Sequence, residues 1–171
     1  MSSARKRFGK IYNKYINQIF RFIFLKTSSQ EIAEDLTSEV FLKAFNFFKN
    51  NNNKIKNERA FLYKTARNII IDFYRNRARN RSISIDDYKN IPDEKQDLEK
   101  KVFLDSRMKK IRVALANINP DYQDVILMRY IDGLSVLEIA DALDKSESAV
   151  RVSIHRALNS LRKELEKTQE A

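Results

Sequence analysis

The feature that most limits the possible folds of this chain is its near lack of glycine and proline. Its 171 residues include only 2 Gly and 2 Pro, whereas 43% of them are hydrophobic. A β-rich fold needs many tight turns, and their backbone geometry falls mainly to Gly, so such a fold is disfavoured. Lys, Glu, Leu, Ile and Ala instead favour long helices. We therefore predict an all-α protein.

Three amphipathic helices are predicted in the first half of the chain, where apolar residues recur every three or four positions. The first covers residues 8–26. The second is expected to begin at a capping box formed by Ser28 and Glu31, and to end in the Asn-rich stretch 49–57. The third covers residues 58–79. This part of the chain should therefore form a helical bundle.

A change in composition divides the chain into two expected domains. Residues 80–100 lose the helical periodicity and gain Ser, Asp and Asn, which predicts a linker. We expect two small helical domains, residues 1–83 and 106–171, joined by a flexible linker at residues 84–105. The first domain has 18 Lys and Arg against 6 Asp and Glu, the linker 4 against 7, and the second domain 11 against 10. A net charge of +12 indicates that the first domain binds a polyanion, although a merely solvated basic surface is the alternative.

Two further helices are expected at the start of the second domain. One runs from about Leu98 to Ala116. Another follows Asn119 and Pro120, which are the residue types favoured at an N-cap and at the first helical position. Gly133 lies where the C-terminal cap of this helix is expected.

The rest of the second domain has the pattern of a helix-turn-helix. Ser135 and Glu138 can form a capping box that begins a short helix. A three-residue turn starts at Asp144, and Ser146 can cap a long last helix. Gly is usual at the position of Asp144, but Asp tolerates the left-handed conformation better than most residues, so the turn should survive at some cost in stability. The motif places its second helix in the major groove of DNA, and a plain helical hairpin is the alternative.

The last helix has a polar and positively charged outer face. Arg151 and Arg156 can donate hydrogen bonds to phosphates or to guanine, and Val152 can contact a thymine methyl. The chain has a single histidine and no cysteine, and the histidine is expected to face DNA or to lie between helices rather than to bind a metal. The residues predicted to contact duplex DNA are Ser148, Arg151, Val152, His155 and Arg156.

The second helix of the first domain has an acidic strip. Asp35, Ser38, Glu39 and Leu42 share one helix face, because they lie at positions i, i+3, i+4 and i+7. An acidic strip on a basic domain indicates a surface that binds protein rather than nucleic acid. The alternative is that the carboxylates only stabilise the helix N-terminus through its dipole.

The third helix is basic and aromatic along its polar side. Aromatic rings that stack on bases, together with cations that follow the phosphates, are what a single-stranded nucleic acid requires. The side chains concerned include Tyr63, Lys64, Arg67, Asn68, Arg75 and Arg79.

Taken together, these segments resemble the extracytoplasmic-function (ECF) sigma factors of bacterial RNA polymerase, over nearly the whole chain. Residues 33–45 (AEDLTSEVFLKAF) are similar to the polymerase-binding segment of that family, with Ser38 where Gln is usual. Residues 58–79 resemble its promoter-melting and minus-ten-binding helix, and residues 113–162 its minus-thirty-five-binding domain. The order and spacing of the three segments make the resemblance specific.

The resemblance implies a factor that binds core RNA polymerase and promoter DNA and starts transcription. The polymerase contacts that it implies are Asp35, Ser38, Glu39, Phe41 and Leu42. It implies no catalytic residue, no metal and no cofactor. We expect a cytoplasmic protein without membrane insertion, and the sequence leaves open whether an anti-sigma protein holds it inactive.

The resemblance also implies contacts with the minus-ten element, where the Asn-rich loop would capture a flipped base of the non-template strand. The residues implied are Lys54, Lys56, Asn57, Tyr63, Lys64, Arg67, Asn68, Asp72, Arg75 and Arg79.

Two other classes of protein stay open at this point. A helix-turn-helix regulator would bind an operator, and would need a sensor or dimerisation face in its first domain. A nuclease would need clustered carboxylates around a metal. Asp35 and Glu39 are the one candidate pair in the basic domain, and the sequence suggests no third ligand for them.

Overall fold

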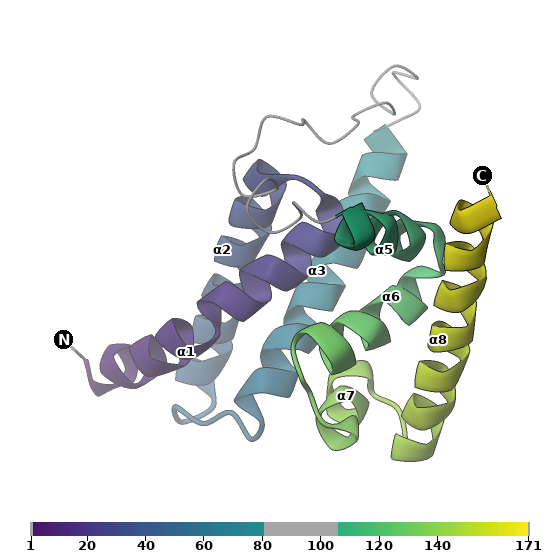
Figure 1. Cartoon of the computed structure of the whole chain (residues 1–171). Helices are drawn as coiled ribbons and strands as arrows, with labels where there is room; N and C mark the ends of the chain where they lie inside the picture. Colours follow the sequence, from purple (N-terminus) through teal and green to yellow (C-terminus); the bar gives the residue numbers. More distant parts are fainter. Residues whose placement is uncertain (1, 81–105, 171) are drawn as a thin grey trace. The chain divides into compact units, whose positions relative to one another are not determined.

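The computed structural model describes residues 2–80 and 106–170 of the protein, and every regular element within those ranges is helical (Figure 1). The prediction of an all-α fold is confirmed. The chain divides into two compact units, Met1–Asp93 and Glu94–Ala171. The division falls inside the predicted linker, residues 84–105, which itself lies outside the described residues.

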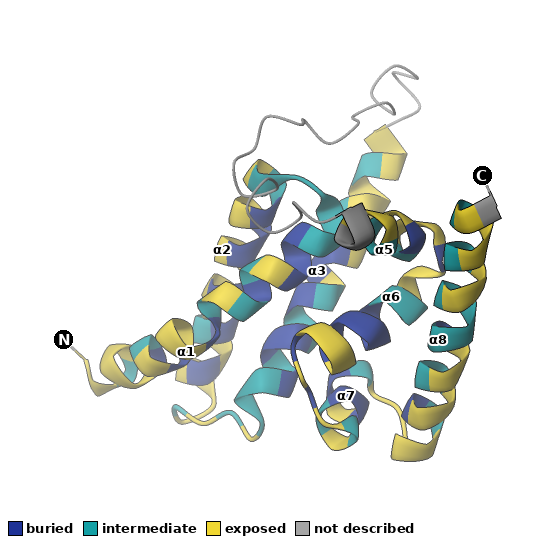
Figure 2. Ribbon diagram, viewed as in Figure 1, coloured by how far each residue is buried: buried dark blue, intermediate teal, exposed yellow. Residues whose placement is uncertain are grey.

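The first unit is a bundle of three helices, α1 (Ser3–Thr27), α2 (Gln30–Asn50) and α3 (Glu58–Asn80). Each helix packs against the other two. The apolar stripes that predicted the helices all face the shared core, which appears as the dark blue inner sides of the ribbons in Figure 2. The core side chains with no exposed surface are Ile19, Phe22, Ile23, Ala33, Val40, Ala44, Leu62, Tyr63 and Ala66.

The junction between α1 and α2 differs from the prediction, because Ser28 and Glu31 do not form the capping box that begins α2. Ser28 instead ends α1 with a left-handed φ of 55°, and its backbone N–H donates to the carbonyl of Phe24 at 2.8 Å. The next residue, Ser29, is the N-cap of α2, since its hydroxyl accepts from the backbone N–H of Ile32 at 3.3 Å. Ser28 therefore ends α1, and Ser29 begins α2.

The Asn-rich stretch forms the turn between α2 and α3. Asn52 and Asn53 have φ angles of 55° and 60°, in the left-handed region that Asn enters more easily than most residues. Asn57 caps α3, because its side-chain oxygen accepts from the N–H of Ala60 at 3.0 Å. The asparagines are therefore required by the backbone of this turn.

The second unit contains α5 (Ser106–Asn117), α6 (Pro120–Ile126), a π-helical turn η3 (Leu127–Ile131), α7 (Val136–Leu143) and α8 (Glu147–Glu170). The last helix, α8, packs against α5, α6 and α7. The start of the helix predicted from about Leu98 lies outside the described residues. The buried apolar side chains of this unit include Ala114, Val125, Met128, Leu134, Ile139, Val150 and Ala157.

The π-helical turn that follows α6 was not predicted. The cap at Asn119 forms as expected, because its side chain accepts from the N–H of Asp121 at 2.8 Å. The chain then widens, so that the N–H of Asp132 donates to the carbonyl of Leu127 five residues earlier, at 3.0 Å. Gly133, with φ of 69°, follows this turn and leads the chain toward α7.

The helix-turn-helix geometry is present as predicted. The hydroxyl of Ser135 accepts from the N–H of Glu138 at 3.1 Å, and the Glu138 carboxylate accepts from the N–H of Ser135 at 3.2 Å. Asp144 takes the left-handed conformation, with φ of 53°. The hydroxyl of Ser146 accepts from the N–H of Ala149 at 3.1 Å and caps α8.

Replacing the aspartate of this turn with glycine should stabilise the second unit. We expect Asp144→Gly to raise the free energy of unfolding by about 1 kcal/mol, because Gly adopts a positive φ without steric cost. Asp144→Val should lower it, since a β-branched residue is disfavoured there. Urea denaturation followed by circular dichroism measures both variants, and a destabilised glycine variant would contradict this account of the turn.

Candidate protein and nucleic-acid interfaces

The acidic strip predicted on α2 lies on the surface. Asp35, Ser38, Glu39 and Leu42 are all exposed, and 61% of Leu42 is accessible. The carboxylate of Glu39 lies 3.3 Å from Nζ of Lys43, one turn further along the helix. An exposed pair of this kind is weak and easily exchanged for another partner. The strip therefore offers carboxylates around an exposed apolar side chain, a combination suited to binding protein.

Phe41, which was expected to contact the polymerase together with this strip, lies in the core with 5% of its surface exposed. Its ring contacts Tyr12 edge-to-face, with ring centres 4.9 Å apart, and Phe8 with ring centres 6.5 Å apart. Both partners belong to α1. Phe41 thus holds α2 against α1, and its buried ring is not part of the exposed strip.

Most of the residues predicted on α3 share its outer side. Asn68, Asp72, Arg75 and Arg79 are exposed, and Lys64 and Arg67 are half-buried. Nη1 of Arg75 lies 3.7 Å from Oδ1 of Asp72, a loose and exposed contact. This side of α3 is a mainly basic surface with one carboxylate.

Tyr63 corrects the prediction for α3. It has no exposed surface and its ring packs edge-to-face against Phe22, with ring centres 5.2 Å apart. Because its ring is inside the bundle, Tyr63 cannot stack on a DNA base in this conformation. The sequence could not distinguish the two roles, since a Tyr suits a core as well as a stacking surface.

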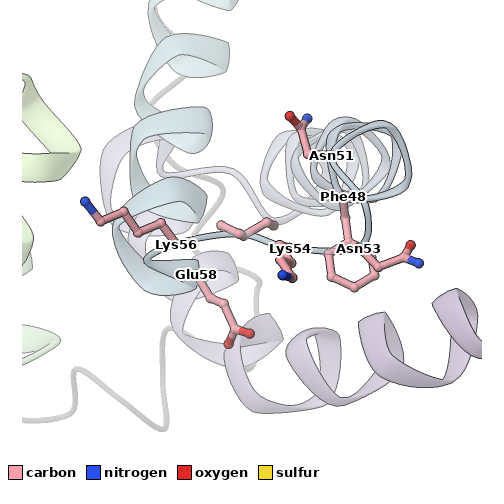
Figure 3. Close-up of a pocket in the computed structure, with 7 residues that line it drawn as sticks. Phe48, Asn51, Asn53, Lys54, Lys56 and Glu58 are labelled. Atoms are coloured by element: carbon pink, nitrogen blue, oxygen red, sulfur yellow. The ribbon is translucent and has the colours of Figure 1, made fainter.

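The turn between α2 and α3 forms an open hollow of about 650 Å³ (Figure 3). Lys54 and Lys56, predicted to contact DNA, line this hollow and are exposed. Asn57 does not line it and caps α3 instead. The Asn-rich stretch 49–57, predicted to capture a flipped base, also contributes Asn51, Asn53 and Ile55 to the lining. Phe48 and Glu58, which flank this stretch, were not predicted.

Tyr74 ties the outer half of α3 to the end of α1. Its hydroxyl donates to the backbone carbonyl of Lys26 at 3.0 Å. Burial raises the pKa of the Tyr74 hydroxyl above its usual value, and nearby Arg77 partly opposes this effect. The hydroxyl therefore keeps its proton at neutral pH and remains a hydrogen-bond donor.

The residues predicted on the recognition helix all lie on the exposed side of α8. Ser148, Arg151, Val152, His155 and Arg156 are exposed. Nη2 of Arg151 donates to the carboxylate of Glu147 at 3.2 Å, one turn earlier. The arrangement leaves cations and a small apolar side chain on one outer face, as major-groove binding requires.

Neither a cluster of metal ligands nor a membrane-spanning helix occurs in the described parts of the chain. Within residues 2–80 and 106–170, no group of three or more His, Asp or Glu side chains is placed to hold a metal ion. In the same ranges, no helix combines the length and the apolar character needed to cross a lipid bilayer.

Comparison with known families assigns both units. The sigma-70 region 2 family matches residues 11–80, and the sigma-70 region 4 family matches residues 108–161. The chain therefore belongs to the sigma-70 family, the DNA-binding initiation factors of bacterial RNA polymerase. Regions 2 and 4 together imply promoter recognition and transcription initiation.

Similarity to individual proteins identifies the ECF group within this family. The chain is 29% identical over 167 residues to the ECF sigma factor SigX of Bacillus subtilis, covering 95% of this chain and 86% of SigX. It is 27% identical over 154 residues to the ECF sigma factor BldN of Streptomyces coelicolor, covering 90% of this chain but only 58% of BldN. The solved RpoE of Bartonella quintana, in complex with the anti-sigma factor NepR, has the same fold, with a TM-score of 0.69 at 20% identity over 94% of this chain and 98% of RpoE.

Substituting two adjacent residues of α2 should distinguish a buried side chain from an exposed one by their effects on stability. We expect Phe41→Ala to lower the free energy of unfolding of the first unit by roughly 3–5 kcal/mol, because it leaves a cavity between α1 and α2. Leu42→Ala should change it by less than about 0.5 kcal/mol, because Leu42 is exposed. Thermal and urea denaturation measure both. Equal losses for the two variants would show that the assigned burial is wrong.

Proposed function

We propose that this chain works as an ECF sigma factor through three separate surfaces, one for the polymerase and two for promoter DNA. The acidic strip of α2 binds core polymerase, the hollow and the outer side of α3 bind the opened minus-ten region, and α8 binds the minus-thirty-five element as a duplex. The observation that carries this proposal is that an exposed acidic strip and the basic surfaces lie on different parts of the chain. The chain's two units match sigma-70 regions 2 and 4.

The polymerase surface consists of Asp35, Ser38, Glu39 and Leu42. In the ECF sigma factors that the sequence resembles, this segment docks on the clamp coiled coil of the largest polymerase subunit. Leu42 supplies an apolar contact surrounded by carboxylates, and charged groups of this kind set orientation and association rate more than affinity. Phe41 is buried against α1 and holds this part of α2 in place.

The minus-ten surface combines the hollow with α3. Extruding a base costs a few kcal/mol of stacking, and a shaped pocket can offset this cost. Asn51, Asn53 and the largely buried Phe48 line the hollow, and Lys54 and Lys56 supply its positive charge (Figure 3). Asn68, Arg75 and the other exposed polar side chains of α3 would then follow the backbone of the separated strand.

The chain catalyses no reaction in this proposal, since bond formation belongs to the polymerase. In this proposal it acts in the cytoplasm, where the polymerase and the promoters are. A helix-turn-helix regulator would also use α8, but it would have no need of the acidic strip on α2.

An anti-sigma protein is a further proposed partner. RpoE of Bartonella quintana, which shares this fold, was solved with its anti-sigma factor NepR. A protein that covers the α2 strip or α8 would keep this chain from polymerase or promoter. Co-purification with a partner that is displaced by core polymerase tests this proposal.

Reversing one charge on the α2 strip should abolish polymerase binding. We expect Glu39→Lys to remove association with core polymerase, because it places a cation in the centre of the acidic strip. Surface plasmon resonance with immobilised core polymerase measures the loss. Glu166→Lys makes the same change at an exposed position of α8 beyond the recognition residues and is the control. Normal binding by a folded Glu39→Lys variant would defeat the docking proposal.

Shortening the recognition arginines should weaken binding to the upstream element. We expect Arg151→Ala and Arg156→Ala each to weaken binding to the cognate duplex by about 1–3 kcal/mol if the replaced arginine contacts a base. The loss of binding to a duplex of scrambled sequence should be smaller. Lys167→Ala removes an exposed charge from the far end of the same helix and should leave discrimination unchanged. Fluorescence anisotropy measures all three variants. Undiminished discrimination by both arginine variants would remove the recognition role of α8.

A further inference from the structure

The outer face of α1 has a continuous row of polar side chains, four of them cationic, that the proposed function does not use. Its members are spaced three, four, three and four residues apart, so they form a single line along the helix on the side away from the core. All of them are exposed. The line extends over about 21 Å, at 1.5 Å per residue. We call it the α1 basic row, and its members are Arg7, Lys10, Lys14, Asn17 and Arg21.

Helix stability does not account for this row. The 25 residues of α1 include no Asp or Glu, so no i, i+4 ion pair within the helix can compensate its charge. The row begins at Arg7, beyond the first turn of α1, so the helix dipole does not favour it. The helix itself thus supplies no anionic partner for Lys10 and Lys14, which points to an external one.

We propose that the α1 basic row binds the phosphates of double-stranded promoter DNA, independently of sequence. This inference rests on the proposed function. The row contains no aromatic side chain on which separated bases could stack, whereas Lys, Arg and Asn all donate hydrogen bonds to phosphate oxygens. The apolar side of α1 is already buried in the bundle, so the helix cannot place an apolar face in a lipid surface. Duplex DNA is the polyanion that matches these constraints.

The test uses holoenzyme reconstituted from the full chain and core polymerase. We expect Lys10→Gln/Lys14→Gln to make the slope of log affinity against log salt less negative by about 1.8, since each lost phosphate contact contributes about 0.9. The loss of affinity should be the same on a promoter duplex and on a scrambled duplex. Lys10→Arg/Lys14→Arg keeps the charges and should behave as the wild type.

A second control removes two charges elsewhere. Lys109→Gln/Lys110→Gln changes exposed positions of α5 and should leave the slope unchanged. An unaltered slope for Lys10→Gln/Lys14→Gln, in a holoenzyme that still initiates transcription, overturns the α1 row and leaves the proposed function standing. Loss of binding to phosphatidylglycerol vesicles with no change on DNA also overturns it. Failure of the wild-type chain to initiate at any promoter sinks the proposed function instead.

Discussion

The packing of α1 against α2 and α3 decides which side chains of the first unit remain available to partners. Phe22 of α1 packs edge-to-face on Tyr63 of α3, and Phe8 of α1 packs on Phe41 of α2. These contacts fix the rotation of α2 and α3 about their own axes. Once the two rings of α2 and α3 are inside, Glu39 and its exposed neighbours on α2 must face outward. The aromatic core thus determines which side chains of α2 and α3 are exposed.

The sequence predicted the order of the helices and the helix-turn-helix with its caps, because periodicity and local hydrogen bonding suffice for those features. It could not predict that Tyr63 is buried, since a Tyr suits a core as well as a stacking surface. Phe41 lies on the apolar stripe of α2, and only the resemblance to the polymerase-binding segment suggested a surface role for it. It also could not tell which of two adjacent serines, Ser28 or Ser29, begins α2. The π-helical turn at Leu127–Ile131 was not predicted from any local pattern.

The two kinds of DNA surface proposed for this protein depend on different physics. Phosphate contacts by exposed cations supply affinity that falls steeply with salt and is the same on every sequence. A hollow that accepts a flipped base, or an arginine that meets a guanine, discriminates among sequences at a cost in stacking or desolvation. A small protein gains by keeping these tasks on different side chains, because the sequence-specific contacts can then change without loss of general affinity for DNA.

The contact between Arg151 and Glu147 bears on the proposed binding of α8 to DNA. In the free protein the Arg151 guanidinium already contacts the Glu147 carboxylate one turn away. A DNA group that binds Arg151 must therefore replace this contact. An exposed pair of this spacing is worth about 0.3–0.5 kcal/mol, or roughly a twofold bias. A single phosphate oxygen gains little over the resident carboxylate, whereas the paired acceptors of guanine exceed it. If α8 binds DNA as proposed, Glu147 would therefore weaken the contacts of Arg151 with non-cognate DNA more than its contacts with guanine.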